Sequence, residues 1–284
     1  MKRKDAIDLP KADFRRKRQY LAPWAFALPG NEEGKTYPPP SDLVTRKTWD
    51  GIMALPDDVA LKSSSYEGSL IGRLYRLQSD WIFSWPEPGC APFMQEPALL
   101  AGEEFDALVF NALHGWYRQA IGCLRNALET LTIAAGLAVS DDQRSFDAWR
   151  RGDKQFTFVH GRTRLRDSLV GQQVDAEASP ESVFGDSAGA WAKRRYARLC
   201  AYAHSQAGYN NGDFWESNGP IFVPTALRVV EAEFRETLAL GYLLLRLGWP
   251  HYRPGRGEAA LLDGPQGEWA RFDPLLRKWL LPAP

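Results

Sequence analysis

The stretch EEFDALVFNALHGWYRQAIGCLRNALETLTIAAGL, residues Glu103–Leu137, decides the fold of this chain. Its apolar side chains recur every three or four residues, which is the spacing of one face of an amphipathic helix. Gly136 and the Ser-Asp-Asp run at 140–142 supply stop signals. The stretch therefore predicts one long helix that begins near Glu103 and ends close to Gly136. The apolar positions are Phe105, Leu108, Val109, Ala112, Leu113, Trp116, Tyr117, Ala120, Ile121, Leu124, Leu128 and Leu131.

Further helices follow from the same spacing. Residues 224–249, PTALRVVEAEFRETLALGYLLLRLGW, predict a helix with Thr225 as its N-cap and an end at Gly248. Residues 188–204 predict a third helix, and residues 144–169 predict one or two short helices. Nothing in the chain suggests a parallel sheet. The sequence therefore predicts an all-α fold, a compact bundle of long antiparallel helices.

The chain is expected to have three parts. Residues 1–97 carry several prolines and tryptophans and predict an irregular N-terminal arm or subdomain. Within that arm, SLIGRLYRLQSDWIFSW from Ser69 to Trp85 leaves a strand pair and a helix both open. Residues 98–250 form the predicted bundle. Residues 251–284 predict a short C-terminal helix that docks on it.

Composition excludes several functional classes. The chain has 35 Lys and Arg residues and 35 Asp and Glu residues, so it has no net charge that would attract nucleic acid or a membrane surface. Three cysteines without metal-ligand spacing predict no metal site and a reducing, cytoplasmic location. No apolar run reaches about 18 residues, which predicts no membrane span, and the charged start lacks a signal-peptide pattern. Phosphate-binding glycine loops and serine-hydrolase or HExxH motifs are missing, so we expect no cofactor, nucleotide kinase or nucleophilic hydrolase.

Polar residues form a stripe on the first predicted helix. Asn111, His114, Arg118, Arg125 and Glu129 fall within an arc of about 60° on a continuous helix. In one interpretation the stripe is the solvent side of that helix, with Arg125 and Glu129 as an i,i+4 ion pair. In the other, it faces a cleft beside the third helix, where His114 and Arg118 would contact a ligand. The sequence leaves both open.

A second group of polar residues surrounds the end of the third helix, in RLCAYAHSQAGYNNGDFW from Arg198 to Trp215. Four cations precede His204, and cations are favourable near a helix C-terminus. With His204 they would clasp a phosphate; alternatively, they are a solvated helix face. The loop after His204 is where a ligand would enter. The four cations are Lys193, Arg194, Arg195 and Arg198, and the loop residues are Tyr209, Asn210, Asn211 and Asp213.

A third basic segment is HGRTRLR from His160 to Arg166. Its arginines alternate with small and apolar residues and would form a local phosphate-binding edge. The other interpretation, slightly favoured, is an exposed loop with ordinary salt bridges.

Two segments together, ALHGWYRQAIGCLRNALETLTIAAGL and RRYARLCAYAHSQAG, resemble the HEPN-like helical superfamily (higher eukaryotes and prokaryotes nucleotide-binding). Its members are bundles in which a helix with an R-x3-E pattern packs on another that ends in a Tyr/Leu…His motif. Arg125 and Glu129 match the first pattern. Leu199, Tyr202 and His204 match the second. The resemblance covers residues 105–248, about half the chain.

The resemblance implies a function. Many HEPN members are metal-independent ribonucleases, often toxins or anti-phage effectors, and they act as homodimers. Their motif is an arginine, four to six residues and a histidine, which Arg198 and His204 satisfy; the residue after the arginine is commonly polar, and here it is Leu199. On this basis His204 would be the acid/base and Arg198 the phosphate clamp, with Glu129 or Arg125 as support. The RNA-binding residues would be Arg118, His114, Arg194, Tyr202, Tyr209, Asn210 and Asn211.

An alternative function stays open. Other HEPN-like families keep the Tyr-x-His ending without a nuclease role, so His204 would then cap or bridge helices. In that case the protein is a non-catalytic helical module that binds a protein partner or a nucleotide.

Overall fold

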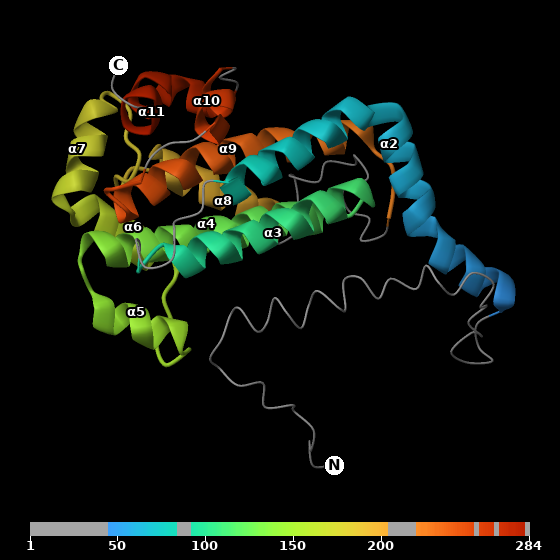
Figure 1. Cartoon of the computed structure of the whole chain (residues 1–284), viewed down its shortest axis with the longest axis horizontal. Coiled ribbons are helices and arrows are strands. Elements are labelled where there is room, and N and C mark those ends of the chain that lie inside the picture. The colour runs from blue at the N-terminus through green and yellow to red at the C-terminus, as the bar shows by residue number, and fades with distance from the viewer. Residues whose placement is uncertain (1–44, 84–91, 204–219, 253–255, 264–266, 282–284) are drawn as a thin grey trace, which may run out of the picture. The chain divides into compact units, whose positions relative to one another are not determined.

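The computed structural model describes residues 45–83, 92–203, 220–252, 256–263 and 267–281. Every regular element in these ranges is a helix, which confirms the all-α prediction (Figure 1). No helix among them is long and apolar enough to cross a membrane. The chain divides into two compact units between Ile52 and Met53, and the side-chain contacts described for residues 53–281 lie within the second unit. The boundaries predicted at residues 97 and 250 both lie inside that unit.

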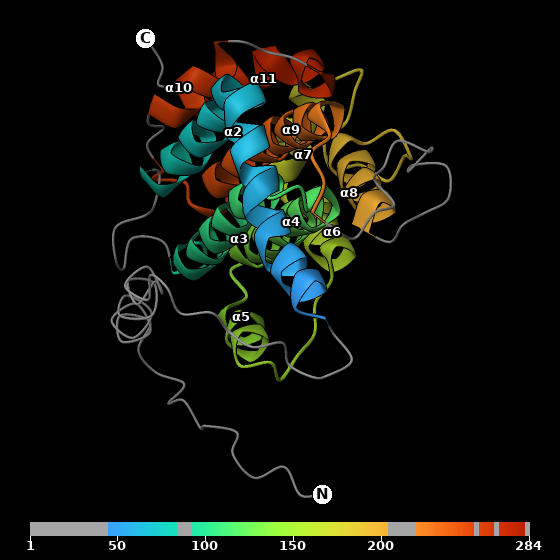
Figure 2. The same cartoon turned by 90° about the vertical axis from the view of Figure 1, so that its right-hand side faces the viewer.

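The stretch that was expected to be one helix forms two. Helix α3 (Gln95–Leu113) and helix α4 (Tyr117–Val139) are separated at His114, Gly115 and Trp116. Gly115 has a φ of +79°, and the amide of Trp116 bonds to the carbonyl of Asn111 at 2.8 Å. This turn brings α3 back alongside α4, as Figures 1 and 2 show. The prediction of a continuous helix was wrong because both halves keep the same apolar spacing across the turn.

Helices α4 and α9 (Pro224–Gly248) form the centre of the bundle. Helix α4 packs against α3, α9, α6 and α8, and α9 is almost entirely buried from Thr237 to Leu245. The predicted helix at 224–249 is confirmed, but its N-cap is Val223 rather than Thr225, because Pro224 occupies the first helical position. The third predicted helix is α8 (Trp191–Ala203).

Shorter helices pack around this centre. Between α4 and α8 lie α5 (Gln143–Arg150), α6 (Phe158–Asp167) and α7 (Leu169–Glu177). After α9 come α10 (Arg256–Leu262), the 3-10 helix η2 (Glu268–Phe272) and α11 (Asp273–Leu280). The C-terminal segment thus docks through three short helices instead of one, and α9 contacts all of them.

The predicted irregular arm was wrong over most of its described part. Residues Arg46–Phe83 form helix α2, which departs from helical geometry at Glu67. Pro56 lies inside it and removes one backbone donor without ending the helix. The helix alternative for the segment from Ser69 is therefore confirmed. Trp81 of α2 packs on Phe105 and Tyr242 with ring centroids 5.2 Å away in each case.

Candidate functional site

The polar side chains of α4 lie at its seam with α8. The guanidinium of Arg125 donates from Nη2 to the hydroxyl of Tyr196 at 2.9 Å and from Nε to Sγ of Cys200 at 3.3 Å. Nη2 of Arg125 also forms an ion pair with Oε2 of Glu129 at 3.3 Å. Tyr196 and Cys200 both belong to α8. This part of the stripe therefore faces the third helix rather than bulk solvent.

Glu129 extends the seam to α6. Its Oε1 accepts the backbone amide of Phe158, the first residue of α6, at 3.1 Å. A carboxylate is favourable there because the N-terminus of a helix carries partial positive charge. The ring of Phe158 in turn stacks on the ring of Tyr196, with the ring centroids 4.0 Å apart and an angle of 1° between the ring planes. Burial and the Glu129 carboxylate raise the pKa of Tyr196, so its hydroxyl stays neutral at physiological pH.

Two members of the predicted stripe lie elsewhere. Asn111 and His114 lie on or at the end of α3, so the five-residue arc on one helix was wrong. His114 Nδ1 lies 2.8 Å from the Phe110 carbonyl oxygen, and its ring packs on Phe110 with centroids 4.1 Å apart. Arg118 does reach α8, since its Nη2 donates to the carbonyl of Ala203 at 3.4 Å. The spacing in the sequence predicted that these residues share one helix, whereas the turn at Gly115 divides them between α3 and α4.

The arginines of α8 meet a buried carboxylate on α9. Glu233 is 3% exposed and bonds through Oε2 to Nη2 of Arg195, which is 2% exposed. Its Oε1 accepts from Nε of Arg198 at 2.7 Å, and Arg198 is 50% exposed. The ring of Tyr202 lies beside the Arg198 guanidinium, 5.9 Å from Cζ to the ring centroid. We name the three charged residues Glu233, Arg195 and Arg198 the Glu233 triad.

Sequence reasoning missed Glu233 and its pairing with Arg195. A signal for it was present: Glu233 falls at an apolar position of the predicted helix, between the buried residues Val230 and Phe234. A carboxylate at such a position needs a charged partner, since burying it alone is costly. Arg195, which looked like part of a solvated cation face, is that partner.

The remaining basic segment has a structural role. His160–Arg166 is helical within α6, so both the loop and the exposed phosphate edge were wrong for Arg162. Arg162 is buried and donates from Nη1 to the carbonyl of Gly185 at 2.7 Å and from Nη2 to Asp186 at 3.0 Å. It anchors the segment that leads into α8.

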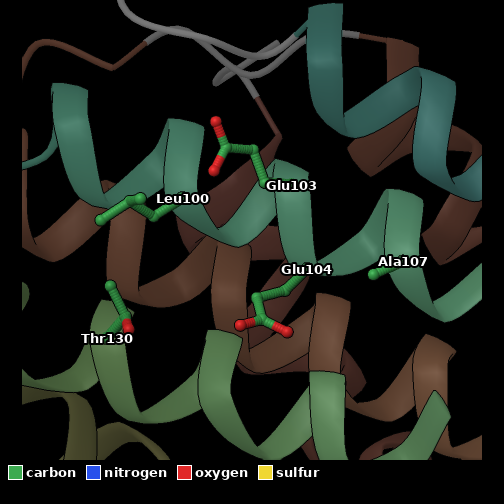
Figure 3. Close-up of a pocket in the computed structure, with 5 residues that line it drawn as sticks. All are labelled: Leu100, Glu103, Glu104, Ala107 and Thr130. Carbon is green, nitrogen blue, oxygen red and sulfur yellow. The ribbon is translucent and has the colours of Figure 1, made fainter. Parts of the chain in front are cut away.

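Two of the depressions on the surface of the described residues bear on ligand binding. The first, of about 430 Å³, lies on the outward side of α8 and includes the predicted residues Arg194 and Arg198. The second, of about 320 Å³, lies between α3 and α4 and is lined by Leu100, Glu103, Glu104, Ala107 and Thr130 (Figure 3). Its carboxylates disfavour an anionic ligand.

A half-buried cysteine, Cys123, interacts with Glu104, which lines the α3–α4 depression. Burial, followed by the Glu104 carboxylate, raises the pKa of Cys123 to about 12. The thiol therefore stays protonated at physiological pH and is a poor nucleophile or metal ligand. Glu104 also accepts a hydrogen bond from Asn126 at 3.3 Å. None of the predicted site residues lines this depression.

Several predicted residues lie outside the described ranges, namely His204, Tyr209, Asn210, Asn211 and Asp213. Within the described ranges, no three His, Cys, Asp or Glu side chains gather in a way that would hold a metal ion. Comparison of the chain with family models, with curated proteins and with solved structures finds no match.

Proposed function

We propose that this protein is a HEPN-like, metal-independent endoribonuclease of a toxin or anti-phage defence system. His204 would act as general base on the 2′-hydroxyl, whose oxygen attacks the phosphorus while the bond to the 5′-oxygen breaks. As general acid, the imidazolium would then return the proton to the leaving 5′-oxygen, and Arg198 would bind the scissile phosphate. The observation that supports this most directly is the Glu233 triad, which holds Arg198 at the protein surface.

The charges of the triad favour a binding role for Arg198. Arg195 already compensates the buried Glu233 carboxylate, and both side chains are almost fully enclosed. Arg198 adds a second cation to the same carboxylate, so the triad carries one excess positive charge. The half-exposed guanidinium of Arg198 is the part of the triad that solvent reaches. An arginine fixed in this way needs little reorganisation to bind a phosphate.

The core explains the departure from the family motif at Leu199. This side chain is fully buried, whereas the side chain of its neighbour Arg198 is half exposed. A polar residue at 199 would be enclosed by apolar side chains at a cost of about 1–3 kcal/mol or more. The apolar residue therefore fits the packing of α8 and does not reduce the exposure of Arg198.

The supporting roles proposed for Arg125 and Glu129 follow from their contacts. Arg125 ties α4 to Tyr196 and Cys200, one turn or less from Arg198 on α8. Glu129 ties α4 to the start of α6. These bonds fix the position of α8, the helix that carries Arg198, and we assign both residues to positioning rather than to contact with RNA.

The test is cleavage of labelled single-stranded RNA by the purified protein, with and without EDTA. We expect cleavage that EDTA does not reduce. His204→Ala should lower the rate by about 10²–10⁴-fold, the usual contribution of a general acid or base. Arg198→Ala should lower it comparably, and Arg198→Lys less, because lysine keeps the charge but loses the planar fork.

A matched control is Arg228→Ala. Arg228 is 61% exposed and pairs with Glu67 at 2.7 Å, which resembles the setting of Arg198. Its removal should leave cleavage unchanged. Absence of cleavage by the wild type, or full activity of both His204→Ala and Arg198→Ala, would overturn the proposal. The non-catalytic helical module would then be the remaining interpretation.

A further inference from the structure

The depression on the outward side of α8 is a basic site that extends beyond Arg198. It is lined by Ala188, Lys193, Arg194, Ala197, Arg198 and Glu268. Lys193 and Ala197 are four residues apart on α8, as are Arg194 and Arg198. Residues with this spacing are neighbours on a helix surface, about 5–6 Å apart at Cβ. Three cations therefore surround the short side chain of Ala197.

The cations of this lining outnumber its carboxylates. Arg194 pairs with Glu268 at 2.5 Å from Nε to Oε1, and its Nη1 also lies 3.9 Å from Oε2 of Glu181, a residue outside the lining. Arg198 shares the Glu233 carboxylate with Arg195. Lys193 donates to the carbonyl oxygen of Asp186 at 3.1 Å, a neutral acceptor, and no carboxylate of the described residues forms an ion pair with it. The lining thus holds three cations and one carboxylate.

We propose that this depression binds backbone phosphates of single-stranded RNA, with Ala197 as its floor and Lys193 and Arg198 on either side. The choice of RNA rests on the proposed function, and Arg198 links the two sites. The small side chain of Ala197 lets a phosphate approach the helix between the cations. A longer residue there would occupy the same space. The acidic depression between α3 and α4 offers no comparable site for an anion.

The experiment compares Ala197→Glu with Ala197→Gln. The two side chains have the same size and both favour helix, and Ala197 is exposed, so the fold is retained in each case. Glutamate, however, places a negative charge where the phosphate would bind. Binding is measured by fluorescence anisotropy of a fluorescein-labelled single-stranded RNA in the His204→Ala background, which prevents cleavage during the measurement.

We expect Ala197→Glu to weaken binding roughly tenfold or more, because like charges brought together at an interface are strongly unfavourable. Ala197→Gln should stay within about twofold of the parent, as for most surface substitutions. Equal affinities for all three proteins, an equal loss in both variants, or no RNA binding by the parent would each overturn the inference.

Salt dependence gives a second measurement. The slope of log affinity against log salt is negative, and every backbone phosphate that a cation neutralises makes it steeper by about 0.7 for single-stranded RNA. Lys193→Ala leaves one phosphate without its cation and should make the slope shallower by that amount, about 0.7. Lys62→Ala removes an exposed lysine of α2 that lines no part of the depression, and it should leave the slope unchanged. An unchanged slope for Lys193→Ala would count against the site.

Failure of this inference can be told apart from failure of the proposed function. If RNA is cleaved but Ala197→Glu binds it like the parent, the nuclease stands and its substrate lies elsewhere. If Ala197→Glu abolishes binding but the wild type cuts no RNA, the basic depression stands without the catalytic role.

Discussion

Glu233 has a different relation to each of its two arginine partners. Arg195 is enclosed with it, so removing either leaves an uncompensated charge inside the protein. Arg198 lies half in solvent, and water replaces much of its interaction when it is removed. The same carboxylate therefore contributes to stability through one arginine and positions the other at the surface.

This difference predicts unequal losses of stability for two neighbouring substitutions. Arg195→Ala should lower the free energy of unfolding by about 3–5 kcal/mol, the usual cost of breaking a buried ion pair. Arg198→Ala should lower it by no more than about 1 kcal/mol. Urea unfolding followed by circular dichroism measures both. Similar losses in the two variants would show that Arg198 is structural and would remove it as a clean test of catalysis.

At the scale of elements, glycines set how closely helices meet. A Cβ on Gly136 of α4 would lie 2.5 Å from the carbonyl oxygen of Gly161 on α6, so the two backbones are in direct contact. This approach brings the start of α6 to Glu129. At Gly115 the positive φ forms the turn between α3 and α4, and a Cβ there would collide with the backbone of Ile221.

Gly115→Ala should therefore be strongly destabilising, by more than the roughly 1 kcal/mol of strain that a positive φ costs an ordinary residue. Gly122→Ala is the matched control within α4, because its Cβ meets nothing within 4 Å. That change should raise stability by about 0.5–1 kcal/mol, since alanine favours helix over glycine. Thermal unfolding distinguishes them, and a neutral Gly115→Ala would contradict the close contact.

At the scale of the molecule, the C-terminal helices are part of the core. Trp269 is fully buried, and the Phe272 ring stacks on the ring of Trp191 of α8 with the ring centroids 4.6 Å apart. Oε1 of Glu236, on α9, accepts the amides of Glu268 at 2.5 Å and Trp269 at 3.1 Å. Burial raises the pKa of Glu236. Residues 267–281 thus complete the enclosure of α8 and α9.

Removing the Trp269 side chain should destabilise the whole bundle. Trp269→Ala is expected to cost about 3–5 kcal/mol. Arg271 lies in the same short helix, is 65% exposed and pairs through Nη1 with Oε1 of Glu181 at 3.6 Å. Arg271→Ala should therefore lower the free energy of unfolding by less than about 1 kcal/mol. Near- and far-ultraviolet circular dichroism should report a single transition in both. Two separate transitions would show that the C-terminal helices unfold independently.

The sequence by itself determined the helical class and the extents of α8 and α9, because their apolar spacing is a local property that each helix carries alone. It also identified Arg125 and Glu129 as a pair, since four residues along a helix are always neighbours. The turn at Gly115 escaped prediction because the apolar period continues across it. Only the tertiary structure decided that Arg195 and Arg198 meet Glu233, since contacts between separate helices depend on how those helices pack and not on spacing along the chain.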